Sequence, residues 1–143
     1  MTKTRQELRQ EQEEAYTHLL VDIFGWNDQS AGFQALKAAG YNSITDIVTL
    51  DKEEIDDMEY EADDGSGTTV IRKVPTKQKK LLKHALLYYD YQVKLRASKM
   101  FDAADWKALT KDMFEDFRET QVPLMIRSQS TSSTSVLMPL HLA

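Results

Sequence analysis

The stretch that decides the fold is residues 50–58, LDKEEIDDM, which has a near twin at residues 109–117, LTKDMFEDF. If Asp51 is an N-cap, Leu50 and Ile55 occupy the two positions that pack together as a hydrophobic staple at a helix start. Leu109, Thr110 and Phe114 repeat this arrangement. Acidic residues in the first turn are favoured by the helix dipole. Both stretches therefore predict a helix start, and no ancestral duplication is needed to explain their similarity.

Helical signals also precede the first twin. Apolar residues recur at helical spacing in a first amphipathic segment, at Tyr16, Leu19, Leu20, Ile23 and Phe24. Residues 30–40, SAGFQALKAAG, predict a second helix that runs from an N-cap at Ser30 to Gly40, a residue suited to the left-handed end of a helix. Ser43 is expected to cap a short helical turn.

Between the twins, the sequence predicts a hairpin and then the longest helix. The Asp-Gly-Ser-Gly turn lies between short flanks and indicates a small β-hairpin at about residues 59–72. Pro75 and Thr76 open a helix of about residues 77–97. Its apolar face is too wide for a surface helix, so we expect it to run through the centre of the domain. Trp106 is expected to close the core.

The 143 residues and the hydrophobic content of 41% are enough for one domain with a modest core. Residues 1–14 have almost no apolar side chains and are expected to be a polar, frayed helical lead-in. Residues 15–120 form the helical domain. Residues 121–143 form a Ser/Thr-rich tail that is expected to be disordered, because Ser and Thr at 128–135 offer little burial to offset chain entropy. The apolar segment 136–143 is short and is interpreted as a tail.

Composition also bears on compartment. The chain has no cysteine, which excludes disulfides and thiolate metal sites and fits a reducing compartment. Its N-terminus is charged and lacks the apolar core of a signal peptide, and no apolar run approaches the ~18 residues that cross a bilayer. We expect a soluble, intracellular protein, cytoplasmic or nuclear, that is not secreted and does not bind a membrane.

No sequence motif supports catalysis, a metal site or a cofactor. The histidines His18, His84 and His141 are far apart and lack metal-ligand spacing. A calcium-loop alignment on Gly65 places Tyr60 at a position that needs a carboxylate, so that motif fails. Gly-rich phosphate-binding motifs are absent from the sequence. The sequence therefore predicts a protein that is not an enzyme and has no cofactor.

The most informative feature is the separation of charge. Residues 51–64 contain nine acids and one base, whereas residues 72–83 contain six bases and no acid. We name as the acidic contact surface Glu53, Glu54, Asp56 and Asp57. We name as the basic contact surface Arg72, Lys73, Lys77, Lys79, Lys80 and Lys83. Lysines in the first turns of a helix oppose its dipole and invite a compensating anion.

Three interpretations of this pattern stay open. The acidic stretch can neutralise the basic one within the same molecule. Alternatively, the two surfaces face apart and dock between molecules, head to tail, which builds filaments if the rotation does not close. The third interpretation is single-stranded nucleic-acid binding, because one helix face carries cations and an aromatic ring at Lys77, Lys80, His84 and Tyr91. The net charge of −5 argues against nucleic-acid binding driven by overall charge.

Two family resemblances add to these interpretations. The run ALKAAGYNSITDIVTLDKEEIDDM, followed by KQKKLLKHALLYY, is similar to the pattern of sterile alpha motif (SAM) domains. It departs from that pattern by the inserted hairpin and by the added module at residues 106–117. SAM-like domains are interaction modules, and several polymerise by placing a basic end-helix surface on an acidic surface. The resemblance implies that Lys77, Lys79, Lys80 and Lys83 would meet Glu53, Glu54, Asp56 and Asp57.

Residues 33–118 also resemble the N-terminal, gag-like segment of copia-type retroelement polyproteins of diatoms and related algae. The segments that carry this resemblance are GYNSITDIVTL, IDDMEYEADDG, LLKHALLYYDYQ and WKALTKDMFEDFR, and the ending of the last is the most specific. The resemblance implies a structural, self-associating or nucleocapsid-associated role.

Taken together, the sequence predicts an all-α, SAM-like helical bundle with one small inserted β-hairpin and disordered tails. The expected function is a non-enzymatic protein-interaction or self-association module, and the second resemblance implies that it is gag-like. The expected partner is a protein, and another copy of the chain, docked head to tail, is one candidate. The alternative is single-stranded nucleic-acid binding through the basic helix face.

Overall fold

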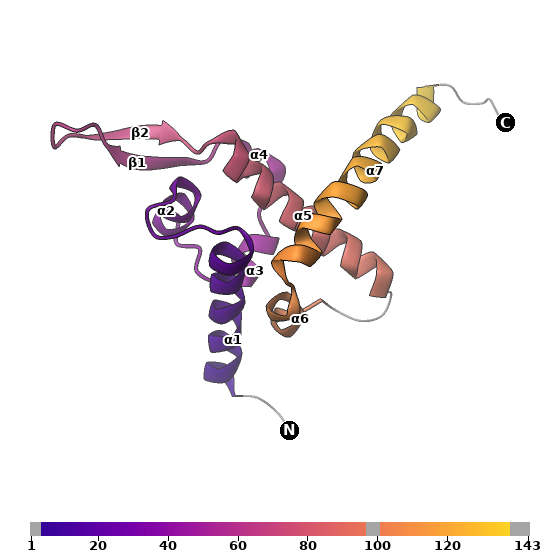
Figure 1. Ribbon diagram of the computed structural model, residues 1–143, viewed down its shortest axis with the longest axis horizontal. Coiled ribbons are helices and arrows are strands. Elements are labelled where there is room, and N and C mark those ends of the chain that lie inside the picture. Colours follow the sequence, from indigo (N-terminus) through magenta and orange to yellow (C-terminus); the bar gives the residue numbers. More distant parts are fainter. Residues whose placement is uncertain (1–3, 97–100, 138–143) are drawn as a thin grey trace.

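The computed structural model describes the backbone of residues 4–96 and 101–137, and the side chains of residues 4–95 and 101–126. The described chain is mostly helical, with one two-stranded antiparallel sheet. This agrees with the predicted helical domain with a small hairpin. The molecule is elongated: the hairpin extends from one end, and α7 extends from the other (Figure 1).

The chain begins with helix α1 (Arg5–Thr17), which is fixed at its start by a reciprocal cap. The Thr4 hydroxyl accepts a hydrogen bond from the Glu7 amide at 3.1 Å, and the Glu7 carboxylate accepts one from the Thr4 amide at 3.0 Å. Residues 5–14 of the predicted lead-in are therefore helical, as expected, and residues 1–3 lie outside the described residues. The boundary of the lead-in after residue 14 does not coincide with a break, because α1 runs through it and the Lys107 ammonium donates to Glu14 at 2.8 Å.

A π-helical segment, η1 (His18–Ile23), continues α1 into the core. Its wider turn shows in the 2.9 Å bond from the Phe24 amide to the Leu19 carbonyl, five residues back. Leu19, Leu20 and Ile23 are all buried in the main hydrophobic cluster. The predicted first amphipathic segment is thus helical, although its last turns have π rather than α geometry.

Three short helices follow, and their starts test the predicted caps. Helix α2 (Ala31–Ala38) begins after Ser30, but the Ser30 hydroxyl accepts from the Asn27 amide and does not cap the helix. Helix α3 (Ile44–Val48) is capped by Ser43, as predicted. Helix α4 (Lys52–Asp56) is capped by Asp51, whose carboxylate accepts from the Glu54 amide at 2.8 Å.

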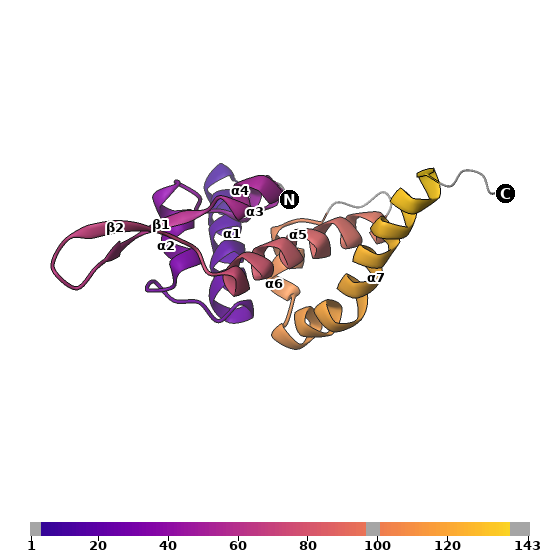
Figure 2. The same ribbon diagram turned by 90° about the horizontal axis from the view of Figure 1, so that it is seen from above.

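The hairpin pairs β1 (Glu59–Asp63) with β2 (Thr69–Lys73) in antiparallel register. The prediction of a hairpin at about 59–72 is confirmed to within one residue. Met58 and Tyr60 pack against a small buried cluster of Ala31, Ala35 and Val74. This cluster attaches the base of the hairpin to α2 and leaves its tip projecting from the helical body (Figure 2).

Helix α5 (Thr76–Arg96) is the predicted long helix; residue 97 of the prediction lies outside the described residues. It contacts α2, α3, α4 and α7, so it does run through the centre of the domain. Its buried residues include Leu82, Ala85 and Tyr88. The Tyr88 ring lies 5.9 Å from the Trp106 ring and 5.1 Å from the Phe117 ring, centroid to centroid, which joins α5 to the C-terminal helices.

The second twin also starts a helix. Helix α6 (Ala103–Ala108) leads into α7 (Lys111–Leu137), and the Thr110 hydroxyl accepts from the Met113 amide at 3.1 Å. Leu109 and Phe114 are buried in the main cluster, as are Leu50 and Ile55 of the first twin. All four predicted staple residues therefore belong to one core.

The structure differs from the sequence prediction at the predicted tail. The prediction places disorder from residue 121, whereas α7 stays helical through this point to Leu137. Val122 is buried, and Met125 packs against the main cluster, because both continue the helical spacing of Phe114 and Phe117. Residues 138–143 of the predicted apolar tail, which include His141, lie outside the described residues.

Candidate protein-interaction surfaces

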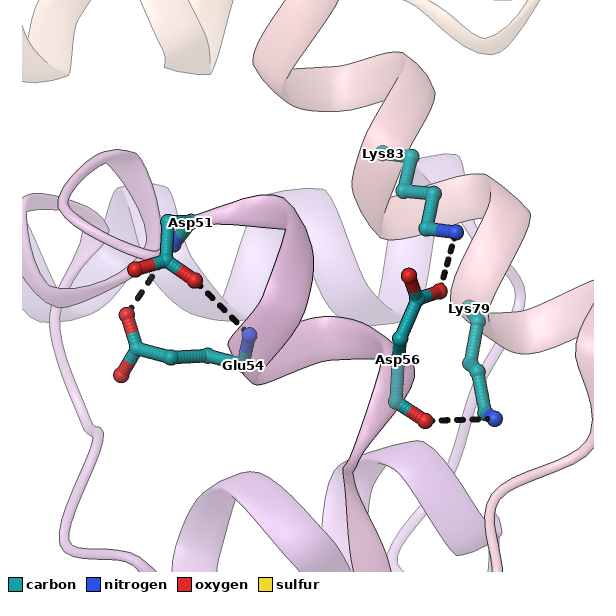
Figure 3. Close-up of polar contacts among 5 residues, drawn as sticks. All are labelled: Asp51, Glu54, Asp56, Lys79 and Lys83. Carbon is teal, nitrogen blue, oxygen red and sulfur yellow. Dashed lines mark hydrogen bonds and ion pairs between the residues drawn. The ribbon is translucent and has the colours of Figure 1, made fainter.

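The acidic and basic contact surfaces lie side by side in one molecule, because α4 packs against the start of α5. The Lys83 ammonium forms an ion pair with the Asp56 carboxylate, and the Lys79 ammonium donates to the Asp56 backbone carbonyl at 2.9 Å (Figure 3). The hydrogen bond from Lys83 lowers the pKa of Asp56 below its usual value. At these three residues the structure matches the interpretation of neutralisation within the molecule.

Other members of the acidic contact surface have different roles. The Glu54 carboxylate accepts from the Asp51 amide at 3.0 Å, which completes the capping box of α4 (Figure 3). It also accepts from the Tyr41 hydroxyl at 3.4 Å. Glu53 and Asp57 are exposed, and their side chains form no ion pair or hydrogen bond with any other described residue. Only these two acids of the predicted surface are thus available for an external contact.

Some members of the basic contact surface also have partners within the molecule, and others have none among the described side chains. Lys73 lies 3.5 Å from the Glu59 carboxylate on the opposite strand, with both side chains largely exposed, so this pair contributes little to stability. Lys79 and Lys83 are bound to Asp56. Within residues 4–95 and 101–126, the side chains of Arg72, Lys77 and Lys80 form no ion pair or hydrogen bond.

The predicted nucleic-acid face is not a uniform exposed surface. Lys77 and Lys80 are exposed, but the Arg118 Nε–H donates to His84 Nδ1 at 2.9 Å. Burial, together with Arg118 and Lys80 nearby, lowers the pKa of His84, so its neutral form is favoured. The Tyr91 ring packs 5.4 Å from the Phe117 ring. His84 and Tyr91 are therefore engaged within the fold.

A groove over the middle of α5 brings cations and apolar side chains together. It has a volume of about 510 Å³ and is bounded by the α3–α4 region and by α7. Its apolar lining comes from Val48, Leu50, Leu86, Leu87, Tyr89, Met125 and Ile126, and its polar lining from Lys52, Lys80, Lys83, His84 and Asp90. Ile126 remains 54% exposed. We call this the α5 groove; it suits an apolar group flanked by negative charge.

The hairpin combines an apolar side chain with carboxylates, whereas the α5 groove combines apolar side chains with lysines. Register and the alternation of side chains place on one side of the sheet Glu59, Glu61, Asp63, Thr69, Ile71 and Lys73, which we call the outer face of the hairpin. Glu61 lies directly opposite Ile71, and Ile71 is 59% exposed. The Glu61 carboxylate has no polar partner among the described side chains. This face therefore presents an exposed isoleucine beside carboxylates.

Sequence reasoning found the charged residues but missed these two surfaces. The α5 groove combines residues from positions 48 to 126, and no local signal reveals that they meet. Part of the outer face could have been predicted from the sequence. Once a hairpin is assumed, side chains alternate along the strand, which places Glu59, Glu61 and Asp63 on one side. Ile71, on the facing strand, follows from the register.

Two further observations concern other kinds of site. In the described chain, no three His, Cys, Asp or Glu side chains gather closely enough to hold a metal ion. No described helix combines the length and the apolar character needed to cross a membrane. Comparisons of this chain with protein-family models, with curated proteins and with solved structures find no match.

Proposed function

We propose that this protein is a non-enzymatic interaction module that associates with other copies of itself, and that the β-hairpin is its binding element. The observation that carries the proposal is the outer face of the hairpin, which projects from the helical body and exposes Ile71 among carboxylates. The inner side of the hairpin packs against α2, so the exposed apolar surface of Ile71 on the outer face is available for contact with another molecule.

The manner of attachment supports this role. Two-stranded hairpins are marginal on their own in water. Here the base is fixed by Tyr60 and Met58 against Ala31, Ala35 and Val74, while the Asp64 carboxylate accepts from the Ser66 amide at 2.9 Å within the turn. A hairpin held at both ends can keep its outer face in a fixed geometry, which limits the entropy lost on binding.

We include in the proposal a SAM-like fold and a gag-like, self-associating role, which the two family resemblances imply. The order of α2, the short α3 and α4, and the long α5 supports a SAM-like arrangement, with the hairpin as an insertion. A self-associating role also agrees with what the gag-like resemblance implies. The contact proposed here differs from the one that the SAM resemblance implies, because Asp56, Lys79 and Lys83 bind one another within the molecule.

Sedimentation velocity over a concentration series tests the proposal. Association is expected to weaken between about 0.1 M and about 1 M salt, as the Debye length falls from about 10 Å to about 3 Å. Ile71→Thr keeps a β-branched residue in the strand and is expected to weaken association about tenfold, because apolar area is lost from the contact. Leu8→Gln is the matched control, since Leu8 is 50% exposed on α1, and it should leave association unchanged.

Two results would overturn the proposal. The first is a strict monomer at high concentration and low salt. The second is association that Ile71→Thr and Leu8→Gln alter equally. A titration with a labelled single-stranded oligonucleotide addresses the alternative: tight, salt-sensitive binding that Lys77→Glu abolishes, in a chain that stays monomeric, would establish the nucleic-acid function instead.

A further inference from the structure

The α5 groove needs an occupant that supplies both an apolar group and negative charge. Lys52 and Lys80 lie in its lining, and neither ammonium forms an ion pair or hydrogen bond with any side chain that the structure describes. Leu50, Leu87 and Ile126 provide apolar surface in the same groove. A cationic groove with an apolar lining discriminates against basic and uniformly polar segments, because both would leave charges or apolar area unmatched.

The outer face of the hairpin has the required chemistry. Ile71 is the most exposed aliphatic side chain on the sheet, and Glu61 is its direct cross-strand neighbour. Glu59 and Asp63 lie on the same side, two residues before and after Glu61. An isoleucine flanked by carboxylates complements an apolar groove with lysines in its lining.

The one residue of opposite charge on each surface also fits a contact between the groove and the hairpin. Each surface carries one residue of the sign opposite to its neighbours: Asp90 in the α5 groove and Lys73 on the outer face of the hairpin. Lys73 is only loosely held by Glu59, at 3.5 Å. In a complex between the two surfaces, Asp90 and Lys73 would attract each other instead of opposing the contact.

The two surfaces cannot meet within one molecule. In both views the hairpin extends away from the helical body on the side opposite to α7, whose Met125 and Ile126 line the α5 groove (Figures 1 and 2). The hairpin of one molecule can therefore reach only the groove of another. Such a contact is heterologous: it forms rings where the rotation closes and filaments where it does not.

From these observations we infer that the α5 groove is the acceptor site for the hairpin of a second copy of this chain, with Ile71 inserted and Glu61 facing Lys80. The inference rests on the self-association proposed above and names its second surface. It places the acceptor at the groove rather than at the Lys79 and Lys83 ammonium groups, which bind Asp56.

A pair of lysine variants tests the acceptor site. Lys80→Glu reverses a charge in the groove, and Lys77→Glu reverses the charge of an exposed lysine one turn earlier on α5 that does not line it. Both change the net charge equally. Lys80→Glu is expected to weaken association at least about tenfold, and Lys77→Glu by less than about twofold. Circular dichroism checks that both variants stay folded.

Mixing two defective chains gives a sharper result. Lys80→Glu leaves the hairpin intact, and Glu61→Lys leaves the groove intact, so each chain alone is expected to be monomeric. A mixture is expected to regain association beyond the heterodimer, because the intact hairpin pairs with the intact groove and the charge-reversed hairpin pairs with the charge-reversed groove. The double variant Glu61→Lys/Lys80→Glu restores opposite charges within every contact and is expected to regain association.

The outcomes separate this inference from the proposed function. If the unmodified chain associates, but Lys80→Glu and Lys77→Glu behave alike, the acceptor is elsewhere and the inference fails while the proposed function stands. If Glu61→Lys weakens association and Lys80→Glu does not, the hairpin binds outside the α5 groove and the inference likewise fails. If the unmodified chain never associates, the proposed function fails and the inference fails with it.

Discussion

Replacement of Gly32 by alanine tests how tightly α2 packs against the rest of the domain. A Cβ atom at this position would lie 2.7 Å from Cζ3 of Trp26, closer still to Cη2, and 3.0 Å from the Gln78 side-chain oxygen. Trp26 is 5% exposed, and its ring packs 4.9 Å from that of Phe24. The Gly32 amide also donates to Gln78 at 2.6 Å. The indole is therefore buried against a second aromatic ring, so moving it aside disturbs the packing of the core.

The expected magnitude follows from two opposing effects. Alanine favours a helix over glycine by about 1 kcal/mol in a helix interior, and by less near its first turn. Overpacking a close-packed core costs about 1–3 kcal/mol, because rings and backbone must shift. The clash involves a buried indole, so we expect the packing cost to exceed the helical gain. Gly32→Ala should therefore lower the free energy of unfolding by about 1–2 kcal/mol, and the melting temperature by roughly 4–8 °C.

Urea denaturation followed by circular dichroism measures this difference. Ala38→Gly, at an exposed position of the same helix, gives the intrinsic cost of glycine in α2. Trp26→Leu removes the part of the ring that clashes. In that background Gly32→Ala should become neutral or stabilising, so the double-mutant cycle should show coupling of about 1–2 kcal/mol.

The reasoning would be refuted by a Gly32→Ala variant as stable as the unmodified protein, or by one equally destabilised in the Trp26→Leu background. The first result would mean that the indole yields at little cost. The second would place the cost in the backbone of α2 instead of the contact with Trp26.

Two further predictions concern helix starts and pH. Asp51→Ala and Thr110→Ala each remove a cap and should cost about 1 kcal/mol in urea denaturation, whereas serine at either position should retain most of the stability; equal effects of alanine and serine would contradict this. The pKa of His84 is lower in the folded chain than its ordinary value of 6.5 in the unfolded chain. As pH falls through 6.5, the unfolded chain therefore binds more protons at His84 than the folded chain does, so the free energy of unfolding should fall from pH 7 towards pH 5. His84→Gln, which keeps an acceptor for Arg118, should flatten this slope, and a parallel slope would exclude His84 as its source.

Local signals were sufficient for the starts of α3, α4 and α7. Asp51 and Thr110 each cap a helix through an amide three residues ahead, and Ser43 does the same. The hydrogen bonds involved span a single turn, so residue identity and spacing alone predict them. The hairpin at about 59–72 was also predicted, because a Gly-containing turn between short strands is a local pattern.

Two predictions from the sequence were wrong: the Ser30 cap and the start of the tail at residue 121. Ser30 precedes α2 as predicted, yet its hydroxyl accepts from the Asn27 amide instead of capping the helix, because the preceding turn competes for it. The tail boundary at 121 failed for the opposite reason. Ser/Thr composition suggested disorder, while Val122 extended the buried face of α7 by tertiary packing.

For the acidic and basic contact surfaces, the sequence determined which residues are charged, and only the tertiary structure decided which of them are paired. The sequence determined that acids and bases segregate, since this depends on composition along the chain. Only the packing of α4 against α5 decided that Asp56 pairs with Lys83, 27 residues away, and only the packing of α7 against α5 decided that Arg118 engages His84. Only the packing of α7 and of the α3–α4 region against α5 produced the groove in whose lining Lys80 lies. Caps form within one helical turn, whereas the partner of a charged side chain depends on how separate helices pack.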